Sequence, residues 1–313
     1  MLAAPTPRWS RYVAIGDSFS EGLWDDPDGR EAPQRGWADL LASHLSARRS
    51  AAGEAPLEYA NLAIRGRLLR PILVEQVPAA LALGPDLVAS RISARRVEAG
   101  EAPLEYANLA IRGRLLLPIL AEQLNPALAL KPDLVSLIGG YNDMMRPAAD
   151  IDRIARNLEA GVVRLREAGV DVLLGTGVDA ADSPLMKATR SRVGIYNSLI
   201  WSMARRHGAY VVDLWGMRSL RDWRMWAEDR IHLTTDGHAR VAQGALVGLG
   251  LTPDDAAWDD PLTPLPPTPR MQKAREDAAW VREHLYPWAT RRLRGTSSGD
   301  DRSPKRPELS PVE

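Results

Sequence analysis

Two short segments at opposite ends of the sequence carry side chains that could act together in covalent catalysis. Ser18 follows an apolar run and the residues Gly16 and Asp17, while Asp229 and His232 stand three residues apart near the other end. A spacing of three lets a carboxylate reach an imidazole and hold the tautomer whose other nitrogen can take a proton. A serine hydroxyl beside such a pair is a nucleophile with its general base. These residue types therefore indicate a serine hydrolase.

Each segment also has a simpler interpretation. Gly-Asp-Ser is an ordinary turn and helix N-cap sequence, and the Asp229–His232 segment could be a capping loop or half of a metal site. A metal-dependent phosphoesterase could use Asp17, Asp143, Asp229 and His232, but a single histidine at metal-ligand spacing makes this the weaker hypothesis. Asp17 and Asp143 are more typical of loop hydrogen-bond partners than of catalytic acids, and His238 of a residue that supports the final helix.

The elements that must position these side chains alternate between strands and helices. Short apolar runs predict strands, and apolar residues at helical spacing predict amphipathic helices. We expect strands at 12–15, 134–138, 170–175 and 209–214, and helices at 37–49, 150–168, 186–207 and 236–249. This alternation predicts an α/β fold, a parallel sheet covered by helices on both faces. Because the carboxyl ends of parallel strands share one edge, we expect Ser18, Asn142, Asp229 and His232 to converge there.

A tandem repeat with an offset of 47 residues interrupts this order. Residues 45–91 align with 92–138, and Ala52–Leu69 is identical to Ala99–Leu116. Two copies are fewer than a solenoid needs, so we interpret the repeat as a duplication inside one domain. Only the second copy continues into an unbroken strand, at 134–138, whereas the first ends in a segment with scattered arginines. We therefore expect the second copy to occupy the core positions.

Composition excludes several other classes of protein. The 313 residues include 40 Lys and Arg against 40 Asp and Glu, and this neutrality argues against a general nucleic-acid or membrane-surface binder. The absence of cysteine excludes disulfides and thiol nucleophiles. No apolar run reaches the ~18 residues that span a bilayer. The first strand begins too early to leave room for a secretion signal, so we expect a cytoplasmic protein.

Four motifs in register resemble the blocks of the SGNH (GDSL-type) hydrolase family. They are GDSFSEG after the first strand, NLAxRG after the next, GGYND at 139–143 and DRIHLTTDGH at 229–238. The resemblance covers about residues 11–250 and extends to actinobacterial GDSL-like lipases and acylhydrolases. It implies a three-layer α/β/α sandwich with a mostly parallel sheet, and an enzyme that cleaves small-molecule esters or thioesters without a cofactor or metal.

The resemblance also implies roles for individual residues. Ser18 would be the nucleophile, His232 the base and Asp229 its orienter. The oxyanion hole would consist of the backbone N–H of Ser18, the amide of Asn142 and the N–H of a glycine. Because the block with that glycine is duplicated, Gly113 or Gly66 could supply it, with Asn108 or Asn61 as neighbour. We favour Gly113, because its segment leads directly into the GGYND strand.

The duplication and the C-terminal region leave further questions. If the duplication has spoiled the pocket, the chain would be a non-catalytic module that binds a carbohydrate or a protein partner. The tryptophans at 215, 223 and 226 could wall an acyl or sugar pocket or simply pack in the core. We expect a hydrolase domain over residues 1–250. Residues 251–313 should then form a proline-rich linker, a helix at 271–293 and a disordered tail.

Overall fold

The molecule is organised around one six-stranded sheet. The computed structural model describes residues 9–22, 25, 35–53, 64–65, 105–108, 111–112, 115–146, 148–181, 183, 186–266, 268–287, 290 and 306–310. The strands of the sheet are β1 (Arg11–Gly16), β3 (Glu105–Asn108), β5 (Leu134–Ile138), β6 (Asp171–Gly175), β7 (Tyr210–Val212) and β8 (Arg306–Ser310). Their order across the sheet is β7-β6-β5-β1-β3-β8. The first five are mutually parallel, and β8 pairs antiparallel with β3.

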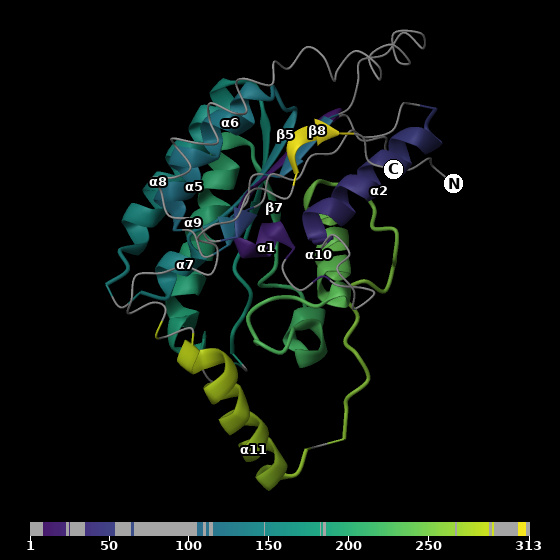
Figure 1. Cartoon of the computed structure of the whole chain (residues 1–313). Coiled ribbons are helices and arrows are strands. Elements are labelled where there is room, and N and C mark those ends of the chain that lie inside the picture. Colours follow the sequence, from purple (N-terminus) through teal and green to yellow (C-terminus); the bar gives the residue numbers. More distant parts are fainter. Residues whose placement is uncertain are drawn as a thin grey trace.

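Helices cover both faces of this sheet (Figure 1). The described α-helices are α1 (Ser18–Glu21), α2 (Trp37–Ala51), α5 (Leu116–Glu122), α6 (Leu124–Ala129), α7 (Tyr141–Met144), α8 (Ile151–Glu167), α9 (Arg190–His207), α10 (Thr235–Gly248) and α11 (Arg270–Trp280). Helices α2 and α10 pack on one face, and α5, α6, α8 and α9 pack on the other. The predicted three-layer α/β/α fold is thereby confirmed. Among the described helices, none combines the length and apolar composition that crossing a membrane requires.

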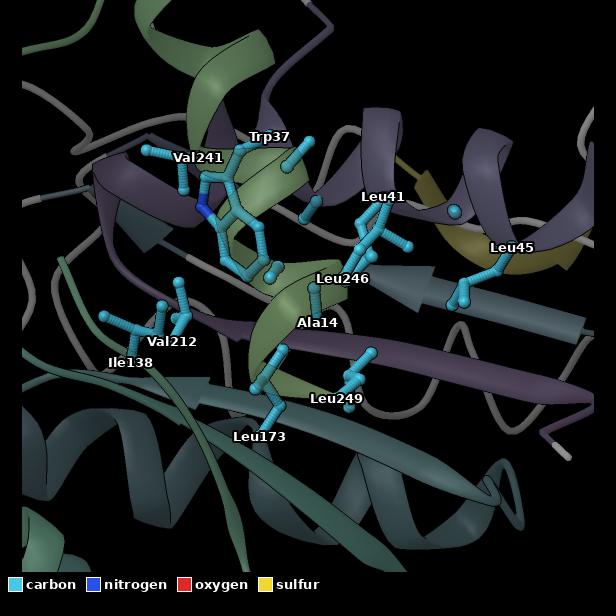
Figure 2. Close-up of a cluster of buried hydrophobic side chains, with 14 of the residues drawn as sticks. Ala14, Trp37, Leu41, Leu45, Ile138, Leu173, Val212, Val241, Leu246 and Leu249 are labelled. Carbon is cyan, nitrogen blue, oxygen red and sulfur yellow. The ribbon is translucent and has the colours of Figure 1, made fainter. Parts of the chain in front are cut away.

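The central strand β1 shows why two apolar layers form. Successive side chains of a strand point to opposite faces, so Tyr12 and Ala14 belong to one buried cluster while Val13 and Ile15 belong to the other. Figure 2 shows the first cluster, in which side chains of α2 and α10 meet those of the strands around Ala14. A strand buried on both faces is apolar at nearly every position, which is why this run is recognisable in the sequence.

The strand order creates a crevice at the carboxyl ends of the central strands, between β1 and β5. From β1 the chain passes through α2 to β3 on one side, and from β5 it passes through α8 to β6 on the other. Neighbouring strands whose connections leave in opposite directions form a switch point, and ligands of open α/β sheets bind outside the carboxyl ends of such strands. Strands β1 and β5 lead directly into α1 and α7, so the GDS and GGYND segments meet at this crevice.

The second repeat copy supplies two strands of the sheet, in agreement with the expectation that this copy occupies core positions. Strands β3 and β5 and helices α5 and α6 all come from residues 92–138. Of the first copy, residues 45–53 at the end of α2 and the strand β2 (Ile64–Arg65) are described, and β2 pairs in parallel with β4 (Ile111–Arg112) of the second. The paired residues are equivalent positions of the repeat. Residues 54–63 and 66–91 of the first copy lie outside the described residues.

The C-terminal region departs from its prediction at one point. The helix expected at 271–293 is present as α11, followed by a π-helical turn at Val281–Leu285. The prediction of a disordered tail is wrong for Arg306–Ser310, which form β8 and pair with β3. Backbone pairing with an open sheet edge requires no apolar pattern, so the charged and proline-containing sequence gave no sign of it. The domain boundary near residue 250 stays a prediction.

Candidate active site

The turn after β1 presents the Ser18 hydroxyl at the crevice. Gly16 has a φ of +155°, and a Cβ there would lie 2.6 Å from the carbonyl oxygen of Ile138. Glycine therefore lets β1 turn sharply while it stays paired with β5. Asp17 follows as the N-cap of α1, where its Oδ1 accepts a hydrogen bond from the N–H of Phe19 at 3.1 Å. Ser18 is thus the first residue of a short helix at the end of a central strand.

His232 lies between Ser18 and Asp229. Its Nε2 is 2.9 Å from Ser18 Oγ, and its Nδ1 is 2.5 Å from Asp229 Oδ2. A carboxylate can only accept, so Nδ1 carries the proton and Nε2 is left to accept from the serine hydroxyl. The two segments from opposite ends of the chain therefore form one line of hydrogen bonds.

Backbone contacts fix the Asp229 side chain. Its Oδ1 accepts hydrogen bonds from the N–H groups of Ile231 and His232, each at 3.0 Å. Burial alone would raise the pKa of Asp229, but the hydrogen bond from His232 and these backbone donors hold it well below its usual range. The carboxyl group of Asp229 is therefore ionised in the folded protein at neutral pH. It can stabilise a positive charge that develops on His232.

Backbone hydrogen bonds close the loop that carries Asp229 and His232. The N–H of Ala227 donates to the carbonyl of His232 at 2.8 Å, and the N–H of Thr234 donates to that of Met225 at 3.0 Å. Arg230, inside the loop, has a φ of +57°. The loop is thus a compact unit whose ends are tied beside the start of α10.

Asn142 approaches the same crevice from α7. The chain turns after β5 at Gly140, whose φ is +94° and where a Cβ would lie 2.5 Å from the hydroxyl of Tyr196. The Asn142 amide nitrogen donates to Asp17 Oδ2 at 2.9 Å. Asp17 therefore links the nucleophile turn to the GGYND turn and orients the amide of Asn142.

Burial raises the pKa of Asp17 to about 7, with smaller contributions from the nearby carboxylates Asp143 and Glu21. In the unfolded chain an aspartate titrates near ~4. Between these values the folded state binds the proton and the unfolded state does not. Asp17 therefore contributes stability that is present at low pH and is lost as the pH rises through about 7.

The loss of the Asp17 contribution to stability as the pH rises can be tested. Asp17→Asn should stabilise the protein relative to the wild type by about 2–3 kcal/mol more at pH 8 than at pH 5, because asparagine does not titrate. Urea unfolding of both proteins at the two pH values measures the difference. Asp152→Asn, at an exposed position in the first turn of α8, serves as the control. Parallel stability profiles for Asp17→Asn and the wild type would contradict the prediction.

Asp143 and His238, which also belong to the motifs, form hydrogen bonds with the starts of helices. Asp143 Oδ2 accepts from the N–H of Leu116 at 2.9 Å, at the first turn of α5, and burial raises the pKa of Asp143. His238 is buried, and its Nδ1 accepts from the N–H of Trp37 at the start of α2. Asp143 is thus a hydrogen-bond partner of the first turn of α5. His238, expected to support the final helix, lies within that helix, α10, and contacts the start of α2.

The glycine of the oxyanion hole lies in the duplicated block. Gly113, Gly66 and Asn61 are outside the described residues, and of Asn108 the structure describes the backbone within β3. Each glycine directly follows a described strand, β4 or β2, and both of these strands contact α1. The two repeat copies thus both reach the nucleophile helix, and the choice of Gly113 stays a prediction.

A cavity of about 180 Å³ opens between these elements. Ser18, Asn142 and His232 lie on its wall, together with many apolar side chains. The apolar part includes Phe19, Ile138, Val178, Leu214, Trp223 and Trp226. In the part of the chain that the structure describes, no group of three or more His, Cys, Asp or Glu residues could hold a metal ion. The arrangement suits acyl transfer to a serine within an apolar pocket.

Comparison with known families gives one match, to the GDSL-like Lipase/Acylhydrolase family over residues 89–240. The chain carries a domain of the GDSL-like lipase/acylhydrolase family. This confirms the predicted family and the predicted enzyme class, an ester hydrolase. The match begins close to the start of the second repeat copy, which accords with that copy providing β3 and β5 of the GDSL domain.

Solved structures agree on the fold. An alpha/beta hydrolase enzyme from the metagenome of Lake Arreo, Spain, is similar with a TM-score of 0.52 and 23% identity, over 77% of this chain and 95% of that one. An acetylxylan esterase from Geobacillus stearothermophilus is similar with a TM-score of 0.51 and 17% identity, over 79% and 97%. No curated protein matches the chain in sequence.

Some residues at the site were not singled out by their sequence pattern. Tyr141, inside the GGYND motif, lines the cavity and donates to the carbonyl of Gly175 at 2.9 Å. Trp223 and Trp226 line the cavity as the sequence allowed, whereas Trp215 packs against the apolar core under α9. Arg230 belongs to the DRIHLTTDGH motif, and its contact with Asp277 lies 47 residues further along the chain, so the motif does not indicate it.

Proposed function

We propose that this chain hydrolyses carboxylic esters through a covalent acyl-serine intermediate. Ser18 Oγ attacks the acyl carbonyl while His232 Nε2 takes its proton, and the alcohol leaves with that proton. A water molecule, deprotonated by the same nitrogen, then attacks the acyl carbonyl, and the acid departs as Ser18 recovers its proton. The observation that carries this proposal is the line of hydrogen bonds from Asp229 through His232 to Ser18, at 2.5 and 2.9 Å.

Asp229 acts in this scheme as an orienter and not as a proton acceptor. It fixes the imidazole tautomer and stabilises the imidazolium that forms when His232 takes the serine proton. The depressed pKa of Asp229 supports this role, because a carboxyl group that keeps its negative charge is the better partner for a cation.

The oxyanion of the tetrahedral intermediate needs donors that are already in place. The first N–H groups of a helix have no intrahelical acceptor, and Ser18 is the first residue of α1. The Asn142 amide nitrogen carries two hydrogens, so it can serve Asp17 and an oxyanion together. We assign the oxyanion hole to the N–H of Ser18, the amide of Asn142 and the N–H of Gly113, with Gly66 as the alternative.

The cavity favours a neutral, apolar acyl or alcohol group. Its charged rim residues Asp179 and Arg221 are paired with each other at 3.2 Å, and Asp179 also pairs with Arg190. Arg221 is thus already engaged by a carboxylate, so an anionic substrate would have to compete with Asp179 for it. An uncharged ester can bury its apolar part against Phe19 and Trp226 beside the nucleophile.

Asn142→Ala should lower kcat by roughly 10²- to 10³-fold, the loss found when one side-chain donor of an oxyanion hole is removed. KM should change much less, because the oxyanion forms only in the transition state. Steady-state kinetics on a p-nitrophenyl ester measures both constants. Asn125→Ala, at a surface position bonded to Arg164, is the matched control and should leave kcat unchanged. A kcat within threefold of the wild type would remove Asn142 from the oxyanion hole.

Covalent labelling tests the proposed function most directly. The purified protein, treated with a fluorophosphonate, should gain one adduct by intact mass, and peptide mapping should place it on Ser18. Ser18→Ala should gain none. If a folded, monodisperse sample resists labelling and hydrolyses no ester, the alternative of a non-catalytic binding module takes its place.

A further inference from the structure

The C-terminal helix α11 contacts the loop between Asp229 and His232. Arg230 Nη1 donates to Asp277 Oδ1 at 2.7 Å, and the Arg230 guanidinium lies over the ring of Trp280, 5.0 Å from its centroid. Asp277 and Trp280 are three residues apart, so both stand on one face of α11. Figure 1 shows α11 beyond α7, at the end of the molecule where β1 and β5 lead into α1 and α7.

Arg230 is held from two sides. The guanidinium also lies near the ring of Trp223, 6.0 Å from its centroid, so it is placed between a tryptophan of the domain and a tryptophan of α11. The side chains of Arg230 and Asp277 are 29% and 41% exposed, and an ion pair this accessible contributes little by itself. The combination of an ion pair with two stacked rings restrains the arginine more strongly than any one contact.

The backbone of Arg230 needs such restraint. A φ of +57° is sparsely populated for a residue with a Cβ, and such conformations persist where the surroundings determine them. The next residue but one is His232, the imidazole of the hydrogen-bond line. A change in the backbone at Arg230 would therefore move the imidazole relative to Ser18 or Asp229.

The linker that leads to α11 is itself fixed to the domain. Asp259 Oδ1 accepts from the N–H and the hydroxyl of Ser219, and Arg224 donates to the carbonyl of Thr263 at 2.9 Å. Ser219 and Arg224 belong to the two short 3₁₀ turns Ser219–Arg221 and Trp223–Met225, just before the loop. The C-terminal extension thus contacts the chain on both sides of Trp223, and α11 is not loosely tethered.

We propose that α11 acts as a clamp, in which Asp277 and Trp280 hold Arg230 and thereby position the Asp229–His232 loop for catalysis. Arg230 is a positioning residue, since it acts through His232 and bonds to α11. This inference rests on the proposed function, because it assigns α11 a part in the same serine chemistry. Removal of the clamp should lower the fraction of molecules in which His232 Nε2 faces Ser18. The apolar cavity should still bind the substrate.

The test uses the full chain with Asp277→Asn and Trp280→Leu, which alter α11 and none of the proposed catalytic residues. Each variant should lower kcat about 10-fold, with KM within about twofold, because misplacement of a catalytic group acts on the reaction and not on binding. Amide hydrogen exchange of residues 226–234 should become faster in both variants. Glu276→Gln, one residue away and bonded to Gln272 on α11, is the matched control and should match the wild type.

A double-mutant cycle on Arg230 and Asp277 separates the clamp from a general effect on stability. Arg230→Gln removes the ion pair and both ring contacts, so it should lose at least as much kcat as Asp277→Asn. The double variant should lose no more than Arg230→Gln alone, because Asp277 acts on the loop only through Arg230. Arg230→Lys, which keeps the charge but not the planar guanidinium, should recover part of the loss. Additive losses would overturn the clamp.

The two readouts also separate this proposal from the proposed function. Unchanged exchange in Asp277→Asn and Trp280→Leu would overturn the clamp whether or not the protein hydrolyses esters. Faster exchange with an unchanged kcat would overturn the positioning role of Arg230. A wild type no more active than Ser18→Ala would count against the proposed function, and the exchange data would still report whether α11 restrains the loop.

Discussion

Replacement of Ser18 by alanine should lower kcat by roughly 10⁴- to 10⁶-fold, the range found when the nucleophile of a serine hydrolase is removed. The loss is large because the acyl-serine intermediate can no longer form, and the remaining donors can only assist direct attack by water. Hydrolysis of a p-nitrophenyl ester, measured with enough enzyme to detect the residual rate, gives the ratio of the two kcat values.

A second serine of the same cavity provides the control. Ser183 lines the cavity and its hydroxyl accepts from the N–H of Met186, so Ser183→Ala removes a cavity hydroxyl without touching His232. That variant should keep kcat within about threefold, as expected of a residue outside a catalytic unit. Wild-type activity in Ser18→Ala would exclude the acyl-serine mechanism.

Asp229→Asn should lower kcat by about 10⁴-fold, the loss known for the corresponding change in a serine protease triad. The carboxylate accepts three hydrogen bonds, two from backbone N–H groups and one from His232 Nδ1. An asparagine whose oxygen accepts from the backbone turns its NH₂ group toward Nδ1. The imidazole would then carry its proton on Nε2, where it can no longer accept from Ser18.

The same substitution at Asp236 separates this effect from a change of charge. Asp236 is exposed in the first turn of α10, a few residues beyond His232. Asp236→Asn should leave kcat within about twofold, because surface substitutions rarely disturb a site. Thermal unfolding of both variants shows whether either has lost its fold. Equal and small losses in the two variants would mean that Asp229 does not orient the base.

Much of the site could be predicted because its residues follow strands that are recognisable by themselves. The run before Gly16 is apolar, since β1 is buried on both faces. Leu134–Ile138 is apolar except for Ser136, whose buried hydroxyl accepts from that of Tyr12 at 2.9 Å. Parallel strands then bring Ser18 and Asn142 together without further information. The link between Asp229 and His232 is local, so spacing alone indicates it.

Other features could not be read from the sequence because they depend on contacts between distant segments. The parallel pairing of Ile64–Arg65 with Ile111–Arg112 joins two copies of one sequence, and no pattern says that a segment will pair with its own duplicate. Arg230 finds Asp277 only once the linker has brought α11 back to the loop. The strand β8 depends on the edge of β3 and not on its own composition.

The antiparallel strand β8 has a consequence for synthesis on the ribosome. Its partner β3 precedes β5, β6 and β7 in the chain, whereas β8 follows every other described strand. Until β8 is made, β3 lacks this antiparallel partner, and unpaired strand edges can pair with neighbouring nascent chains. A chain released early, after α10, would contain Ser18, Asn142, Asp229 and His232 but would lack the strand that covers this edge. We therefore expect a chain that includes β8 to associate less than one that stops after α10.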